Sequence, residues 1–483
     1  MQNIQFEIKD VELTYLDREI LSIDRLAIHF MDRIGIVGPN GSGKTSLLRL
    51  LAGELEPAKG RIHRHADFAY LKQMETPGGE AADPKVLGKL QVPDLEEGIS
   101  GGEQTKIKIA QLLADYNEAL LIDEPTTHLD QQGIRYLRRE LENYYGTLVL
   151  ISHDRKLLDQ LVTTIWEIRD GKIHVYSGNY TDYEEQKILE ERQQQDAHEQ
   201  YLKEKSRLEA AAQDKMQKAA KMMKGEKANA RKKQGVNRMF ATKPKDVSQK
   251  SMQKSAKAME KRLEQMEKVD AVQHERPITF HRSKALELHH SFPVMGNQLT
   301  LKAGEKTLLE KVRFQFPLGK KIAITGANGS GKSTLLQAIY HRREGMEISP
   351  KVEFGFFEQL AYQEKSNETV LNSLKKTTDY EEGFLRSVLH SMYFKGNDIY
   401  KKLRYLSGGE AIRLQLCRLF LGSYHVLLLD EPTNFLDIQT TKALESFFEG
   451  YPGTIIFVSH DAAFVENVAD HVYEIKNNNI IEK

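Results

Sequence analysis

Several features are scarce in this 483-residue chain, and each scarcity excludes a class of protein. A single cysteine, Cys417, rules out an intramolecular disulfide framework and a multi-cysteine zinc site, and we expect it to be a small buried residue of a helix. No apolar run approaches the roughly 18–20 residues that span a bilayer. The mixed-charge start, MQNIQFEIKD, is not typical of a signal peptide. We therefore expect a cytoplasmic protein with no membrane partner.

Net charge is also lacking, because 69 basic side chains balance 69 acidic ones. The balance hides a strong segregation of charge. The segment from Lys215 to Lys254 contains thirteen Lys or Arg and only two acidic residues. Its net charge is therefore +11, and that of the remainder is −11. Such a basic segment favours a polyanionic partner.

Internal repetition is the strongest feature that is present. The first half contains GIVGPNGSGKTSLL, ISGGEQTKIKIA, LLIDEPTTHLD and LVLISHD. The second half contains AITGANGSGKSTLL, LSGGEAIRLQLC, LLLDEPTNFLD and IIFVSHD in the same order. The thirty positions from Asp123 to His153 are matched by the thirty from Asp430 to His460. The repetition predicts two copies of one domain.

The first block of each half, G-x-x-x-x-G-K-[ST], follows a strand-like run and opens a helical pattern. Backbone N–H groups of such a loop wrap nucleotide phosphates, and the helix N-terminus adds partial positive charge. Lys44 and Lys332 are placed to reach the β- and γ-phosphates of ATP, and the hydroxyls of Thr45 and Ser333 to bind Mg²⁺. The predicted loops comprise Gly38, Pro39, Asn40, Gly41, Ser42, Gly43, Lys44, Thr45 and Ser46, and Gly326, Ala327, Asn328, Gly329, Ser330, Gly331, Lys332, Ser333 and Thr334.

Paired carboxylates end an apolar run in each half. A buried strand would deliver Asp123 or Asp430 to the Mg²⁺ shell. Glu124 and Glu431 come next and are placed to act as general bases on the attacking water. An acidic pair at a strand end is often mere solvation, but here it occurs twice beside a phosphate loop.

SGGE together with DEPT-x-x-LD and a later SHD resembles the ATP-binding cassette superfamily, over nearly all of both halves. The resemblance implies an α/β fold with two cassettes that sandwich two ATP molecules head to tail. In a single chain this clamp should close within a monomer. The resemblance also assigns Q-loop metal ligands, signature-loop residues, D-loop residues and catalytic γ-phosphate sensors: Gln73 and Gln359; Ser100, Gly101, Gly102, Glu103, Ser407, Gly408, Gly409 and Glu410; Asp130 and Asp437; His153 and His460.

The two predicted sites differ at the adenine. Tyr15 lies 23 positions before Gly38, where proteins of this superfamily often stack an aromatic ring on the base. The equivalent residue of the second half is Ala303. We expect the second site either to hold adenine more weakly or to use another aromatic residue such as Phe292, since stacking on a base is worth roughly 1–3 kcal/mol.

The middle of the chain, from about Asp182 to Val269, has the composition of long exposed helix. A seam of Met252, Ala256, Met259, Leu263 and Met266 would face a stripe of Ala197, Tyr201, Leu208 and Ala212. Gly225, Gly235 and Pro244 should break the pattern. We predict an antiparallel hairpin with a first arm of about 35–40 residues, rather than a passive charged spacer. The predicted domains are residues 1–181, 182–283 and 284–483.

YSGNYTDYEEQK, residues 176–187, resembles the start of the interdomain linker of ABC-F proteins. These are twin-cassette ATPases that bind the E site of the 50S subunit in the 70S ribosome, with the linker pointing to the P-site tRNA. The resemblance implies contact of the basic tip with 23S rRNA or tRNA. The tip residues are Arg231, Lys232, Lys233, Arg238, Met239, Phe240, Lys243 and Lys245.

A shortened first cassette narrows the family further. Only 61 residues separate Gly38 from Ser100, against 80 between Gly326 and Ser407. With the long basic linker, this resembles the antibiotic-resistance group, and DRIGIVG, SKALELHHSFP and GTIIFVSHD resemble its macrolide and streptogramin B branch. Alternatives are a housekeeping factor for stalled ribosomes or, less in keeping with the basic hairpin, the ATPase subunit of a drug exporter. A DNA-repair ATPase is a further alternative, but the best-known ones carry far longer coiled coils or zinc-binding cysteines, and this sequence has neither.

Overall fold

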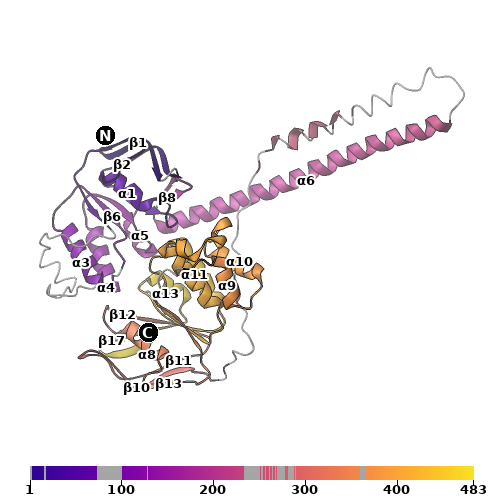
Figure 1. Ribbon diagram of the computed structural model, residues 1–483. Coiled ribbons are helices and arrows are strands. Elements are labelled where there is room, and N and C mark those ends of the chain that lie inside the picture. The colour runs from indigo at the N-terminus through magenta and orange to yellow at the C-terminus, as the bar shows by residue number, and fades with distance from the viewer. Residues whose placement is uncertain are drawn as a thin grey trace. The chain divides into compact units, whose positions relative to one another are not determined.

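The computed structural model describes residues 3–15, 18–72, 101–127, 129–232, 251, 254–255, 257–259, 261–263, 265–266, 268, 278–280, 288, 290–358 and 366–483 (Figure 1). Contacts divide it into one compact unit formed by Met1–Tyr183 and Arg276–Lys483, and a second formed by Glu184–Glu275. The predicted domain limits at 181/182 and 283/284 stay predictions.

Each half contains a six-stranded sheet with the same topology. The order in the first half is β5-β6-β7-β3-β8-β9, and in the second β14-β15-β16-β12-β17-β18. The first five strands of each sheet are parallel and the last is antiparallel. The bounds are β5 Phe68–Leu71, β6 Ala119–Asp123, β7 Thr147–Ile151, β3 Arg33–Val37, β8 Thr164–Arg169, β9 Lys172–Ser177, β14 Phe354–Phe357, β15 Val426–Asp430, β16 Thr454–Val458, β12 Lys321–Gly326, β17 His471–Lys476 and β18 Asn479–Glu482.

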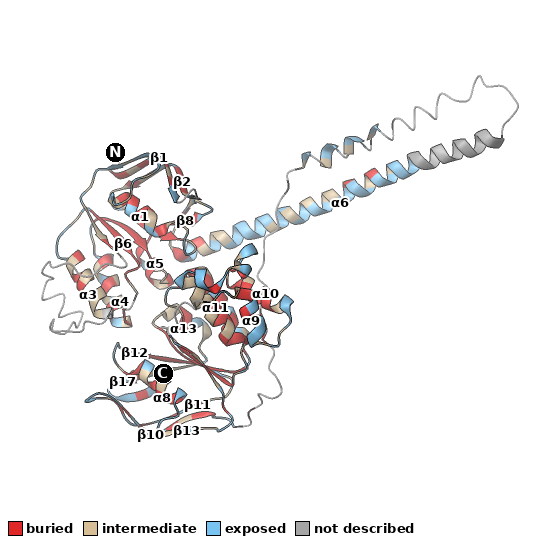
Figure 2. Ribbon diagram, viewed as in Figure 1, coloured by how far each residue is buried: buried red, intermediate tan, exposed pale blue. Residues whose placement is uncertain are grey.

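The central strands are buried along their whole length, which explains their unbroken apolar runs. All five residues of β6, β7 and β16 are buried, as Figure 2 shows by the red strands within each sheet. Parallel strands covered on both faces show such runs because neither face meets water. The predicted fold class, two α/β cassettes in tandem, is confirmed.

An antiparallel three-stranded sheet accompanies each large sheet, in the orders β2-β1-β4 and β11-β10-β13. Alternate inward residues such as Phe6, Ile8 and Leu21 join the core of the first half with helix α1, Lys44–Ala52. Bounds are β1 Ile4–Tyr15, β2 Arg18–His29, β4 Lys59–Arg64, β10 Val294–Ala303, β11 Lys306–Phe316 and β13 Met346–Ile348.

Several helices, among them α1, α8 and α11, begin within a motif block. Aspartate side chains cap four helices: Asp130, Asp154, Asp437 and Asp461 each accept a backbone N–H of the first turn. Cys417 is buried in α11, as predicted. The bounds are α1 Lys44–Ala52, α3 Gly101–Leu112, α4 Gln131–Glu142, α5 Arg155–Leu161, α8 Lys332–Tyr340, α9 Val370–Thr377, α10 Glu382–Ser391, α11 Gly408–Leu421, α12 Ile438–Gly450 and α13 Ala462–Val468. Two 3₁₀ turns, Gly396–Tyr400 and Leu403–Tyr405, precede α11.

The first arm of the linker is one helix, α6, from Tyr180 to Lys232, 53 residues long. The predicted arm of about 35–40 residues was too short, because the helix continues through Gly225. One glycine costs a helix only about 1 kcal/mol, and the flanking Lys, Ala and Met residues favour helix. Within the described residues, no helix has both the length and the apolar character needed to cross a bilayer.

Two polar contacts show that the arms of the hairpin run antiparallel. Lys215 Nζ donates to Ser255 Oγ at 2.5 Å, and Arg262 pairs with Glu204 at 3.7 Å.

The predicted seam is only partly within the described residues. Met259, Leu263 and Met266 are half-buried, whereas Met252 and Ala256 lie outside the described residues. In the opposing stripe Leu208 and Ala212 are buried and Tyr201 is half-buried, but the prediction for Ala197 was wrong, since it is exposed.

The predicted tip cannot be placed. Lys233, Arg238, Met239, Phe240, Lys243 and Lys245 lie outside the described residues. Arg231 and Lys232 end α6, and their side chains are not described.

Candidate ATP-binding sites

The first glycine of each phosphate loop occupies a position that only glycine fits. Gly38 has φ 148°, and a Cβ atom there would lie 2.7 Å from the carbonyl oxygen of Ile168. Gly326 repeats this arrangement, with φ 144° and 2.7 Å to the carbonyl oxygen of Ile475. Each loop is thus packed tightly against the neighbouring strand, β8 or β17, before it turns into α1 or α8.

The loop lysines fold back over their own loops. Lys44 Nζ donates to the carbonyl oxygens of Gly38 and Pro39 at 2.8 and 3.0 Å. Lys332 Nζ donates to those of Gly326 and Ala327 at 2.9 and 3.0 Å. Both ammonium groups are buried, and burial lowers their pKa. They are therefore desolvated cations held at the helix N-terminus, where an anionic phosphate would be favoured.

Glu124 and Glu431 adopt a left-handed backbone conformation, with φ of 49° and 48°. A non-glycine residue there costs of order 1 kcal/mol, and such strain concentrates at functional sites. The residues directly follow the ends of β6 and β15, at Asp123 and Asp430. The same strained turn in both halves indicates that it serves the carboxylates rather than local folding.

Each of these glutamates forms a pair with the predicted histidine. His153 Nε2 lies 3.1 Å from Glu124 Oε1, and the His153 backbone N–H donates to Glu124 Oε2 at 3.3 Å. In the second half, His460 Nε2 lies 3.3 Å from Glu431 Oε1, and its backbone N–H donates to Oε2 at 3.2 Å.

Burial sets the charge of both pairs. It raises the pKa of Glu124 to about 8 and that of Glu431 to about 7. It lowers the pKa of His153 to about 3 and that of His460 to about 4, with the neighbouring lysine acting in the same direction. The imidazoles are therefore neutral at physiological pH, and each is suited to accept or donate one hydrogen bond.

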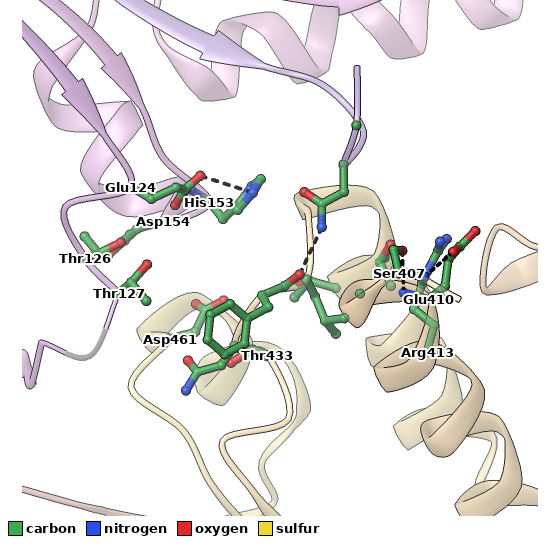
Figure 3. Close-up of a pocket in the computed structure, with 18 of the residues that line it drawn as sticks. Glu124, Thr126, Thr127, His153, Asp154, Ser407, Glu410, Arg413, Thr433 and Asp461 are labelled. Atoms are coloured by element: carbon green, nitrogen blue, oxygen red, sulfur yellow. Dashed lines mark hydrogen bonds and ion pairs between the residues drawn. The ribbon is translucent and has the colours of Figure 1, made fainter. Parts of the chain in front are cut away.

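The first phosphate loop faces the second signature loop across a cavity of about 640 Å³. Figure 3 shows Glu124 and His153 on one side and Ser407, Glu410 and Arg413 on the other. Gly409 is near the first phosphate loop, since a Cβ atom there would lie in ordinary van der Waals contact with Asn40 Nδ2, at 3.8 Å. This is the head-to-tail arrangement that the resemblance implies.

The D-loop aspartates join each half to the opposite phosphate loop. The Asn40 backbone N–H donates to Asp437 Oδ2 at 2.7 Å, and that of Asn328 donates to Asp130 Oδ2 at 3.2 Å. Each aspartate uses its other oxygen to cap its own helix, α12 or α4. The D-loop thus fixes the phosphate loop of the other half through a helix cap.

The second signature loop is rigidly built. Ser407 and Glu410 form a reciprocal capping box at the start of α11, with the Ser407 N–H donating to Glu410 at 2.7 Å. Lys401 donates to both Glu410 oxygens at 2.9 Å. Gly408 opens the helix beside these contacts. The donors of this helix N-terminus are thereby held in place for an anion.

Other predicted site residues are placed only in part. Ser100, Gln73 and Gln359 lie outside the described residues. Gly101, Gly102 and Glu103 form the first turn of α3. For the two glycines, the structure describes the helical backbone and not how far they are buried.

Buried polar atoms in these sites lack protein partners and fit a nucleotide with its cation. Among the described residues, the hydroxyls of Ser42 and Ser330 and Asp430 Oδ1 are buried without a hydrogen-bond partner. Burial raises the pKa of Asp123 and Asp430, while the hydroxyls of Thr45 and Ser333 act to lower it. A hydroxyl and one carboxylate are too few ligands for Mg²⁺ by themselves, so phosphate oxygens and water would complete its shell.

The residues predicted to lie at the adenine have different surroundings in the two halves. Tyr15 lines a cavity of about 390 Å³ together with Lys44, Thr45 and Arg49. Ala303 is exposed at the end of β10. Phe292 lines a different cavity, with Arg313 and Tyr473 and without any phosphate-loop residue, so the structure does not bring it to the second site.

Some contacts around the sites could not be found from sequence motifs. Lys401 lines the 640 Å³ cavity but belongs to no recognised block, and Arg413 lines it from within the LSGGEAIRLQLC block, where no role was assigned to it. Phe435, within the DEPTNFLD block, has φ 65° and accepts a hydrogen bond from Asn40 Nδ2 at 2.9 Å. For the strained glutamates, the sequence offers one signal: in both halves a non-glycine residue directly follows the aspartate that ends the strand.

Known proteins share this architecture. A family model described as ABC transporter matches residues 24–82 and 309–434. "Erythromycin resistance ATP-binding protein MsrA" of Staphylococcus epidermidis is 39% identical, over 99% of each chain. "Ribosome protection protein VmlR" of Bacillus subtilis is 32% identical, over 99% of this chain and 87% of that protein. A solved structure of archaeal ribosome recycling factor aABCE1 with a stalk protein matches with a TM-score of 0.63 at 19% identity, over 96% of this chain and 87% of that one, and shows likeness of fold.

Proposed function

Because the chain belongs to the ABC-F family of twin-cassette ATPases, in its Msr-like branch, we propose that it binds the 70S ribosome in an ATP-closed form and protects it from antibiotics that act on the 50S subunit. The activity itself is ATP hydrolysis. The finer assignments are a cytoplasmic location, docking of a monomer at the E site, and a linker tip that contacts 23S rRNA or the P-site tRNA. Macrolides and streptogramin B are the drugs proposed.

One observation carries this proposal. The match to a protein named for erythromycin resistance spans 99% of both chains, so it includes the hairpin as well as the cassettes. A likeness confined to the cassettes would support ATP hydrolysis alone. The hairpin adds a +11 segment, and phosphate-rich RNA is the polyanion that attracts such a segment.

The cassettes supply the switch. ATP held by the first phosphate loop would also meet the signature residues Ser407 and Gly409 across the 640 Å³ cavity. The nucleotide thereby favours the closed form by contacts that the open form lacks. After hydrolysis these contacts weaken, which would release the protein.

Glu124 and Glu431 are the proposed general bases, and His153 and His460 the groups that position the water and γ-phosphate. Mg²⁺, held by Thr45 with Asp123 and by Ser333 with Asp430, would neutralise phosphate charge, and we assign Gln73 and Gln359 to the same shell. Burial favours the protonated form of both glutamates, since it raises the pKa of Glu124 to about 8 and that of Glu431 to about 7. A bound cation favours their ionised form, which is the form a base requires.

Ribosome pelleting tests the proposal directly. We expect the Glu124→Gln/Glu431→Gln variant to co-sediment with 70S ribosomes in ATP and not in ADP, with less binding as salt rises. Lys44→Ala/Lys332→Ala in the same background should abolish nucleotide-dependent binding. No ATP-dependent pelleting at any salt concentration would refute ribosome binding.

Rescue of translation separates protection from a housekeeping role. The wild-type protein should restore cell-free translation inhibited by erythromycin, whereas a factor for stalled ribosomes would pellet without rescue. Met239→Ala/Phe240→Ala should lose rescue while ATP turnover stays near wild type. An equal loss of turnover would show that the tip and ATPase functions are not separable. The exporter alternative requires a membrane partner and predicts neither result.

A further inference from the structure

The motif at residues 176–187 folds into the junction between β9 and α6, and two of its tyrosines converge on one buried carboxylate. Glu167, in β8, is 2% exposed. Its Oε1 accepts a hydrogen bond from the Tyr183 hydroxyl at 3.1 Å, and its Oε2 accepts one from the Tyr176 hydroxyl at 3.3 Å. The two rings meet edge to face with centroids 5.0 Å apart. Tyr183 belongs to the first turn of α6, so this carboxylate is attached directly to the start of the linker helix.

The same carboxylate lies on the strand beside the first phosphate loop. In the register of β3 and β8, Glu167 is opposite Val37, the last residue before Gly38. The next residue of β8, Ile168, places its carbonyl oxygen against Gly38, with only 2.7 Å left for a Cβ atom. Any movement of this loop when it takes up phosphates must therefore be accommodated by β8, because packed elements transmit small displacements.

A second contact joins the first turn of α6 to the helix that follows His153. The Thr181 N–H donates to Asp159 Oδ1 at 2.8 Å. Asp159 lies in α5, which begins two residues after His153.

The first turn of α6 is also fixed internally. The Asn179 N–H donates to the Asp182 side chain at 2.9 Å, and the Asp182 N–H donates back to the Asn179 side chain at 3.0 Å. The turn is therefore a stiff unit attached to two elements of the first ATP site.

The second cassette lacks this arrangement at the matching position. The two halves are offset by 307 residues, as His153 and His460 show, so the counterpart of Glu167 in the second cassette is Glu474. Glu474 lies in β17 and pairs with Lys483 at 3.3 Å, and Lys483 is the residue that the same offset matches to Tyr176. The junction is thus particular to the cassette that carries the linker.

We propose that Glu167 is a positioning residue that, through Tyr176 and Tyr183, couples the nucleotide state of the first ATP site to the first turn of the linker helix. The coupling itself requires only nucleotide binding by the first cassette. The proposal rests on the proposed function in one respect: we assign ribosome binding to the hairpin that the linker helix begins.

Hydrogen exchange of the purified full-length chain tests the coupling without ribosomes. The Glu124→Gln/Glu431→Gln background, with and without ATP, supplies the two nucleotide states. We expect ATP to slow amide exchange in peptides covering residues 178–190 in this background. Adding Tyr183→Phe removes one hydroxyl and keeps the ring. This variant should speed amide exchange about fivefold in the ATP state, because one net hydrogen bond changes the equilibrium of a local opening by about that factor. It should also abolish the dependence of exchange on ATP.

Tyr144→Phe is the matched control, because the Tyr144 hydroxyl is half-buried and donates its hydrogen bond to the Asn117 carbonyl of the same cassette rather than to Glu167. It should leave the ATP dependence at residues 178–190 intact. Glu167→Gln, which keeps the size of the side chain, should resemble Tyr183→Phe. Unchanged exchange in Tyr183→Phe, or no ATP effect in the background protein, would overturn the coupling. Loss of ribosome pelleting with intact ATP-dependent exchange would instead overturn the proposed function alone.

Discussion

At the scale of single residues, the ATP sites are built at some expense of stability. Glu124 is buried and held in the left-handed region, and burial raises its pKa to about 8 from an ordinary value of 4.5. Folding without nucleotide therefore favours the protonated carboxyl. The stabilisation of the folded protein by the protonated Glu124 is fully present below pH 4.5 and is lost as the pH rises through about 8.

This sign leads to a test on stability. Without nucleotide, Glu124→Gln should raise the thermal unfolding temperature at pH 8, where the buried charge costs a few kcal/mol, and change it little at pH 5. Glu305→Gln, at an exposed turn, serves as the control and should shift neither. Calorimetric unfolding at both pH values measures the difference. An equal shift of Glu124→Gln at the two pH values would contradict the role of burial.

At the scale of elements, sequence patterns were informative wherever one segment decides its own structure. The repeated blocks predicted two copies of one domain, and the apolar runs before the paired carboxylates predicted buried strands, which the structure shows as β6 and β15. Contacts between distant segments were not predictable in this way. Asn40 and Asp437 are 397 positions apart, and Lys401 reaches Glu410 from an irregular turn without a motif.

The length of α6 illustrates the opposite error, in which a local rule was weighted too heavily. Gly225 was expected to end the helix, but its cost is only about 1 kcal/mol against the gain from its neighbours. Gly225→Ala should therefore slow hydrogen exchange in the surrounding turns of α6 by about fivefold. Ala228→Gly should speed it by a similar factor. No change in either variant would show that this part of α6 is not helical in solution.

At the scale of the whole molecule, the contact between the cassettes is asymmetric in charge. Arg155 of α5 pairs with Glu445 of α12 and lies 4.0 Å from Asp461. The same 307-residue offset gives Ala462 and Arg138 as the counterparts of Arg155 and Glu445. Two copies of the first cassette would bring Arg155 toward Arg138, so the ion pair favours pairing of unlike cassettes.

The pair is also shielded from water, with side-chain exposures of 10% for Arg155 and 15% for Glu445. Arg155→Ala should therefore destabilise the folded protein by about 3 kcal/mol, because it leaves a nearly buried carboxylate without its partner, and should reduce ATP turnover. Lys156→Ala is the control, since its partner Glu466 is 68% exposed and such pairs contribute under about 1 kcal/mol.

The charge-exchanged double variant, Arg155→Glu/Glu445→Arg, decides whether the interaction or merely the side-chain volume matters. Asp461 would then face a glutamate, so recovery should be substantial but incomplete. We expect turnover and unfolding temperature to lie between those of Arg155→Ala and wild type. If the double variant is no better than Arg155→Glu alone, the two cassettes do not meet through this pair when ATP is hydrolysed.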